Sequence, residues 1–134
     1  MDDRPGAAEA LIWLAIGAGG ALGAMARHGV NHLVHQRQLS ATFPTGIFLI
    51  NIAGSFAIGL LAGLLAGNRI GLSETARAFI VVGFLGGFTT FSAFSLDTLA
   101  LARAGHTGQA VLNVAGQVGL SLAGVWAGFR LGNG

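Results

Sequence analysis

The residues between Gly86 and Ser95 have the types and spacing to bind ions rather than to catalyse a reaction. This glycine, threonine, serine and phenylalanine segment lies inside a long apolar stretch, where two glycines followed by two threonines weaken a helix. At membrane depth such an interruption frees backbone groups, and these must be buried in protein or line a watery path. Freed carbonyls can coordinate a cation, whereas the N-terminus of the following half-helix favours an anion. The alternative is a continuous helix whose hydroxyls bond back to the preceding turn.

Phe91 and Phe94 are three residues apart, so they share one face of a helix, and Ser92 and Ser95 are interleaved with them. A phenyl ring has a positive edge and a negative face. Rings presented edge-on, with hydroxyl donors beside them, could therefore hold an anion. The alternative is that the two rings only pack against neighbouring helices.

Uncharged polar side chains recur in two other apolar stretches. Asn51 lies early in the second, and the fourth carries Asn113, Gln117 and Ser121 at intervals of four, which places them on one stripe. Amide and hydroxyl donors in a row could replace water around a small, strongly hydrated anion. Hydrogen bonds that only hold helices together are the alternative.

A few charged or titratable residues are also candidates for a functional role. Asp97 is the only acid well inside an apolar stretch, where acids are functional candidates, although its late position lets it reach headgroup water. Arg27 ends the first apolar stretch and could attract anions to a vestibule, or it is an ordinary interfacial arginine. His28, His32 and His35 share a helical face, but without a further ligand we do not expect a metal site there.

The composition indicates an integral membrane protein. Apolar residues make up 53% of the 134 residues and charged residues 9%, against roughly 25% in soluble domains. The chain has no cysteine, which excludes thiol chemistry, and it shows no nucleophile–base pair, so we expect no enzyme activity. Its seven basic residues are scattered arginines, whereas nucleic-acid binding needs a clustered basic face.

Charged residues divide the chain into four long uncharged stretches. Crossing a membrane takes about 20 mostly apolar residues per helix. We therefore predict one all-α domain over 1–134, with the third of its four transmembrane helices interrupted at mid-membrane. The expected spans are 10–26, 46–66, 78–100 and 109–129.

The arginines give this layout almost no preferred orientation. Four spans place both termini and the second connection on one side of the membrane. The count is four on that side and three on the other: Arg4, Arg69, Arg77 and Arg130 against Arg27, Arg37 and Arg103. Because orientation follows the arginine and lysine imbalance, the chain could insert both ways and pair as an antiparallel dimer. A fixed topology set by other signals is the alternative.

Three segments together resemble the Fluc (CrcB-type) fluoride channels of microbial membranes. They are GGALGAMAR at 19–27, FPTG at 43–46 followed by Asn51 and GSF at 54–56, and GFLGGFTTFS at 83–92. Each segment alone is a weak signal. In this order, and with four spans, the three are specific and cover essentially the whole chain.

The resemblance implies a fold and a function. Such channels are antiparallel, dual-topology homodimers of the cell membrane, with two pores for passive fluoride efflux that lowers cytoplasmic fluoride. The matching pore residues are Asn51, Phe91 and Phe94, with Arg27 in the vestibule. We expect the remaining polar pore residues to be Thr90, Ser92, Ser95, Asn113, Gln117 and Ser121.

The resemblance also implies a structural sodium ion at the dimer centre, held by the main-chain carbonyls of Gly86 and Thr89. This chain departs from the family at Ala93, where threonine is common, and at Asn113 and Gln117, where tyrosine and serine are common. These departures change the polar residues that are expected to line the pore.

Two rival functions belong to other classes. A small multidrug transporter also has four spans, but proton-coupled export needs a deep acid in the first span, and 10–26 has none. A non-conducting assembly subunit would use its polar stripe only to hold helices together.

Overall fold

The computed structural model describes residues 6–37 and 41–134, and these residues are almost entirely helical. The elements are α1 (Ala7–Gln36), α2 (Thr45–Ala66), α3 (Glu74–Arg77), the π-helical segment η1 (Ala78–Leu85), α4 (Gly86–Phe88), α5 (Phe91–Arg103) and α6 (Thr107–Asn133). The segments from α3 to α5 form one interrupted crossing. This crossing and the helices α1, α2 and α6 are each long and apolar enough to span a membrane.

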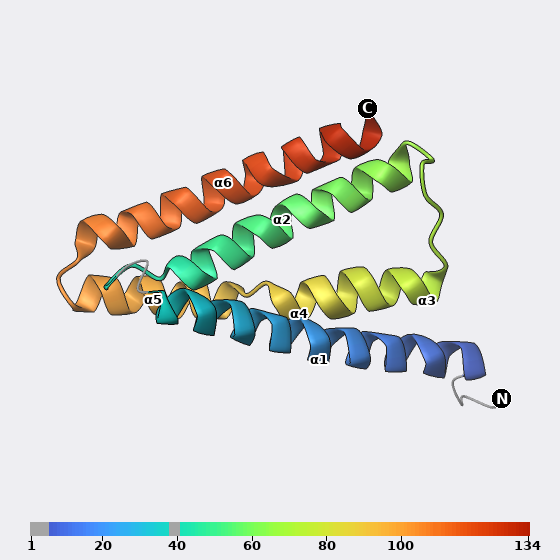
Figure 1. The fold of residues 1–134 in the computed structure, drawn as a ribbon, viewed down its shortest axis with the longest axis horizontal. Helices are drawn as coiled ribbons and strands as arrows, with labels where there is room; N and C mark the ends of the chain where they lie inside the picture. The colour runs from blue at the N-terminus through green and yellow to red at the C-terminus, as the bar shows by residue number, and fades with distance from the viewer. Residues whose placement is uncertain (1–5, 38–40) are drawn as a thin grey trace.

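The four crossings form two parallel pairs that run in opposite directions. Helix α2 lies beside α6, and α1 lies beside the crossing from α3 to α5 (Figure 1). The start of α1 and the end of α6 lie on the same side of the molecule (Figure 1). This arrangement is the up-and-down order expected of four consecutive spans.

Glycines bring α2 and α6 into close contact. A Cβ atom at Gly59 would overlap with the carbonyl oxygen of Val125, and one at Gly63 with that of Phe129. Both contacts join residues 66 positions apart, as expected for two parallel helices in register. Small residues allow backbones in a membrane to approach in this way.

The second pair is held by glycines on both sides. A Cβ atom at Gly23 would overlap with the Phe84 carbonyl oxygen, and one at Gly87 would lie 2.5 Å from the Gly20 carbonyl oxygen. Gly87 therefore remains helical and packs α4 against α1. The structure has the expected interruption within residues 86–95, but the two glycines themselves are helical and form α4 with Phe88.

The interruption lies two residues later, at Thr89 and Thr90. Both adopt extended backbone conformations, with ψ angles of 158° and 121°. The hydroxyl of Thr89 donates to the Leu85 carbonyl at 2.9 Å, and the Thr90 hydroxyl accepts from the Ala93 amide at 3.2 Å. One threonine thus closes α4, and the other caps the start of α5.

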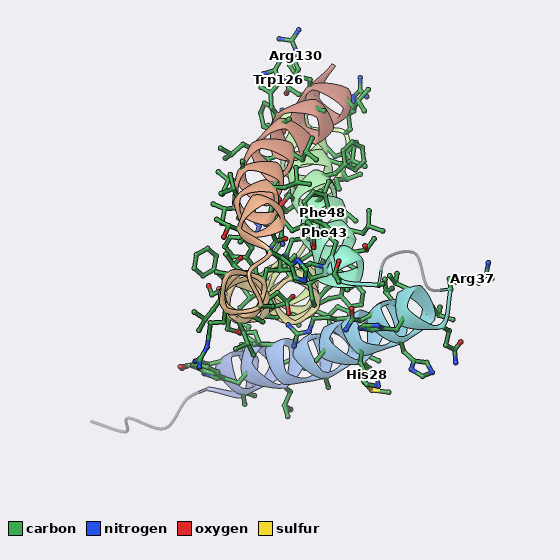
Figure 2. The ribbon with its side chains drawn as sticks, turned by 90° about the vertical axis from the view of Figure 1, so that its left-hand side faces the viewer. His28, Arg37, Phe43, Phe48, Trp126 and Arg130 are labelled. Carbon is green, nitrogen blue, oxygen red and sulfur yellow. The ribbon has the colours of Figure 1, made fainter. Side chains whose placement is uncertain are left out.

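The apolar core is small, and many large side chains face outward. Ile47, Ile50 and Phe94 form the buried cluster where α2 meets α5. Figure 2 shows Trp126 and Arg130 projecting from the end of α6, with the guanidinium carbon 5.7 Å from the indole centre. Amphipathic side chains of this kind are typical of the membrane interface.

Candidate functional site

A groove of about 450 Å³ opens where α2 and α6 meet the interrupted crossing. It contains most of the residues that the sequence singled out. Those that line it are Asn51, Gly86, Thr89, Thr90, Phe91, Phe94, Gln117 and Ser121. The fold thus gathers polar groups from three crossings at the level of the helix break.

Asn51 binds both backbone groups of Thr90. Its Oδ1 accepts from the Thr90 amide at 2.9 Å, and its Nδ2 donates to the Thr90 carbonyl at 3.0 Å. Unpaired backbone groups in an apolar setting are costly. The asparagine of α2 therefore compensates the groups that the interruption releases.

The stripe on α6 continues this hydrogen-bonding. Asn51 Nδ2 also donates to Gln117 Oε1 at 2.7 Å, and Gln117 Nε2 donates to Asn113 Oδ1 at 2.9 Å. Asn113 Nδ2 then donates to the Thr98 hydroxyl at 2.9 Å, which donates to the Phe94 carbonyl at 2.8 Å. A continuous series of bonds therefore links α2, α6 and α5.

The two candidate pore phenylalanines have different environments. Their ring centres are 5.2 Å apart, with a tilt of 52° between the ring planes. Phe94 is 8% exposed and packs with Ile47 and Ile50, whereas Phe91 is 78% exposed. Both line the groove, but only Phe94 is also part of the core.

The helix that carries Arg27 does not end there. Helix α1 continues to Gln36, and Arg27 Nη1 donates to the Thr89 carbonyl at 3.1 Å. Its positive charge therefore lies at the level of the break. The expected span, 10–26, is shorter than this helix because a charged residue was taken to end it.

The carbonyls expected to bind sodium can be tested against this geometry. The Thr90 amide donates to Asn51, so it does not close a helical bond to the carbonyl of Gly86. The Thr89 carbonyl accepts from Arg27 and keeps a second lone pair. Both oxygens suit a hard cation in chemical type, although Arg27 places a positive charge beside one of them.

Three expected pore residues do not line the groove. The Ser92 hydroxyl lies 3.2 Å from the Thr90 hydroxyl, and Ser95 donates to the Phe91 carbonyl at 2.9 Å. Asn113 is fully buried between its two partners. The sequence reading missed Ser55, which lines the groove one turn after Asn51, and that four-residue step was the available signal.

The histidines and Asp97 lie away from the groove. His28 and His32 stack with ring centres 6.3 Å apart, but the part of the chain that the structure describes has no group of three metal-ligating side chains. Asp97 lines a second, smaller pocket together with His106.

Comparison with known proteins gives a consistent result. A family model described as "CrcB-like protein, Camphor Resistance (CrcB)" matches residues 14–129. The fluoride-specific ion channel FluC of Rhodopseudomonas palustris is 46% identical over 121 residues, 90% of this chain and 96% of the relative. That of Paracoccus denitrificans is 49% identical over 122 residues, 91% and 94% of the two chains. These names describe ion channels, a non-enzymatic function.

Proposed function

Because this chain belongs to the CrcB-like protein family, we propose that it is a fluoride-selective channel of the cell membrane. It is a multi-pass membrane protein with four crossings, and relatives that match about 90% of it are named fluoride-specific ion channels. Passive efflux through the channel lowers cytoplasmic fluoride. One structural observation carries the proposal: the helix break, both candidate phenylalanines, and Gln117 and Ser121 of the polar stripe meet in one groove.

The groove offers an anion two kinds of stabilisation. The edges of Phe91 and Phe94 carry partial positive charge, and the polar side chains of α2 and α6 supply hydrogen-bond donors. Fluoride is the smallest halide and holds water most strongly, so close donors must replace its hydration shell. Narrowness and donor spacing then exclude chloride, which follows the general logic of selectivity in pores.

The functional unit in this proposal is an antiparallel homodimer. Phe91 is 78% exposed on a groove that stays open along one side. An exposed apolar surface rimmed by polar groups marks a contact with another protein or with the membrane, and the polar groups of this groove favour a protein partner over lipid. A second copy inserted in the opposite orientation covers this surface and completes two pores in the bilayer.

A structural sodium ion at the dimer centre is part of the proposal. The carbonyls of Gly86 and Thr89 from both copies would hold it. Its fixed positive charge would offset the cost of placing anions in a low-dielectric setting and would join the two breaks. The chain's own contribution is to release these carbonyls: Asn51 takes the Thr90 amide that would otherwise donate to the Gly86 carbonyl, and the Thr90 hydroxyl takes the Ala93 amide that would otherwise donate to the Thr89 carbonyl.

Reconstitution into liposomes tests the function. Purified protein in liposomes loaded with fluoride should release it to an electrode, whether or not a proton gradient is present, and release should fall when N-methylglucamine replaces sodium. Release that depends on the proton gradient would instead support a multidrug-type transporter. A protein that passes no ion would be a non-conducting assembly subunit.

A further inference from the structure

The donors of Asn51 are fully used inside the protein. A carboxamide has two N–H donors, and those of Asn51 go to the Thr90 carbonyl and to Gln117 Oε1. Its oxygen accepts from the Thr90 amide. No N–H of Asn51 is left for an anion in the groove.

The hydrogen bonds from Asn51 through Gln117 and Asn113 to Thr98 form one series. Backbone groups of the third crossing determine, at both ends of this series, which groups donate and which accept. The Thr90 amide can only donate, so it requires the oxygen of Asn51 to face it. At the other end the Phe94 carbonyl can only accept, so the Thr98 hydroxyl must donate to it. The three amides between these ends therefore have one mutually consistent orientation.

Gln117 is the amide that retains a donor at the groove. Its Nε2 makes one bond, to Asn113 Oδ1, which leaves a second N–H. The side chain is only 4% exposed, yet it lines the groove. A spare donor in so buried a position favours an anionic partner.

Two hydroxyls lie one turn beyond this amide. Ser55 follows Asn51, and Ser121 follows Gln117, by the same four-residue step on the paired helices α2 and α6. Among the described residues neither hydroxyl has a hydrogen-bond partner, so both can turn toward a ligand in the groove. The donors that remain available thus cluster around Gln117.

We infer that Asn51 is a positioning residue that holds the interrupted helix, and that Gln117, with Ser55 and Ser121, presents the donors that bind the anion. The inference rests on the proposed function and names its ligand groups. It also gives a role to Gln117, one of the positions at which this chain departs from the family pattern.

The first experiment compares fluoride efflux from liposomes for Gln117→Met and Thr98→Val. Methionine fills a similar volume without an N–H donor, whereas Thr98→Val interrupts the same series of bonds away from the groove. At low fluoride, Gln117→Met should slow efflux about ten- to a hundredfold, the value of one hydrogen bond to a charge. Thr98→Val should keep the wild-type rate, because the Thr90 amide alone still fixes the orientation of Asn51 and Gln117. Equal efflux in the two variants would overturn the assignment of Gln117.

A second measurement uses the wild-type protein, so its result does not depend on whether Gln117→Met folds. Fluoride is titrated into protein that carries ¹⁵N in its glutamine and asparagine side chains. The Gln117 Nε2 resonance should move with fluoride, and the Asn51 Nδ2 resonance should stay nearly fixed. The reverse pattern would make Asn51 the ligand and would refute the inference.

Hydrogen–deuterium exchange at the Thr90 amide tests the positioning role. Asn51→Leu removes the acceptor and should speed exchange at Thr90, whereas Asn51→Asp keeps an oxygen there and should preserve protection. Unchanged exchange in Asn51→Leu would contradict the role. If wild-type protein passes no fluoride, the proposed function fails, yet this exchange result still decides the role of Asn51.

Discussion

The side chain of Asn51 holds both backbone groups of Thr90, with bonds of 2.9 and 3.0 Å, across the break in the third crossing. The two residues are 39 positions apart. Each pairing spares a part-buried backbone group up to about 1–3 kcal/mol, the cost of an unmade bond to a buried group. A helix of one crossing therefore stabilises the irregular backbone of another, and this allows the groove to form.

Replacing Phe94 with isoleucine should abolish fluoride efflux and also weaken the fold. The ring edge is lost from the groove, and the buried cluster with Ile47 and Ile50 is repacked, at a cost of about 1–3 kcal/mol. Fluoride-electrode recordings and thermal unfolding in detergent measure the two effects. Phe91→Ile is the matched control, because Phe91 is exposed: it should lose efflux but change stability by less than about 0.5 kcal/mol. Normal efflux from Phe94→Ile would refute the role of the ring edge.

Gly23→Ala should destabilise the pairing of α1 with the third crossing. The added Cβ would overlap with the Phe84 carbonyl, so the backbones must separate, at a cost of about 1–3 kcal/mol. Thermal unfolding in detergent should report the loss. Gly29→Ala in the same helix meets nothing within 4 Å and should be neutral or stabilising by up to about 1 kcal/mol. Similar unfolding temperatures for the two variants would show that close packing at Gly23 is not required.

Arg27→Gln should reduce fluoride efflux roughly tenfold at low ionic strength, because a positive charge beside the break is lost. Arg27→Lys keeps the charge and should retain most of the efflux, and Arg37→Gln at the exposed end of α1 should match the wild type. Added salt should narrow these differences. If Arg27→Lys loses as much as Arg27→Gln, the bond to Thr89 matters rather than the charge.

Gly71→Cys tests insertion in both orientations. The natural chain has no cysteine, and a Cβ at Gly71 meets nothing within 4 Å, so the variant carries one unobstructed thiol in the connection between α2 and α3. About half of the molecules in intact cells should react with a membrane-impermeant maleimide. Reaction of all or none of them would establish a single orientation and would rule out the antiparallel dimer.

The sequence was informative where lipid imposes simple rules. Charged side chains are costly in hydrocarbon, so uncharged stretches located the four crossings. A weak helix inside an apolar stretch likewise indicated an interruption. Which residues of that segment leave the helix, Thr89 and Thr90, could not be predicted, because Gly87 is helical and packs against Gly20 on another helix. Local propensity does not contain such contacts.

Arg27 shows the limit of counting charges. The predicted end of the first crossing assumed that arginine must reach water, but the Arg27 guanidinium donates a hydrogen bond to the Thr89 carbonyl at the helix break. If Arg27 is left out of the count, four arginines lie on one side of the membrane and two on the other. The labelling of Gly71→Cys is therefore a more direct test of dual topology than the charge balance. The sequence also could not predict which amide group donates and which accepts in the series through Gln117, because that direction depends on a partner 66 residues away.

In the proposed function, fluoride itself carries current through this protein. The most direct measurement is the reversal potential across a planar bilayer that contains the purified protein, with a tenfold fluoride gradient and equal chloride on both sides. The account predicts reversal at the fluoride equilibrium potential, about 59 mV in magnitude. Reversal near zero, or at the potential of the accompanying cation, would contradict it.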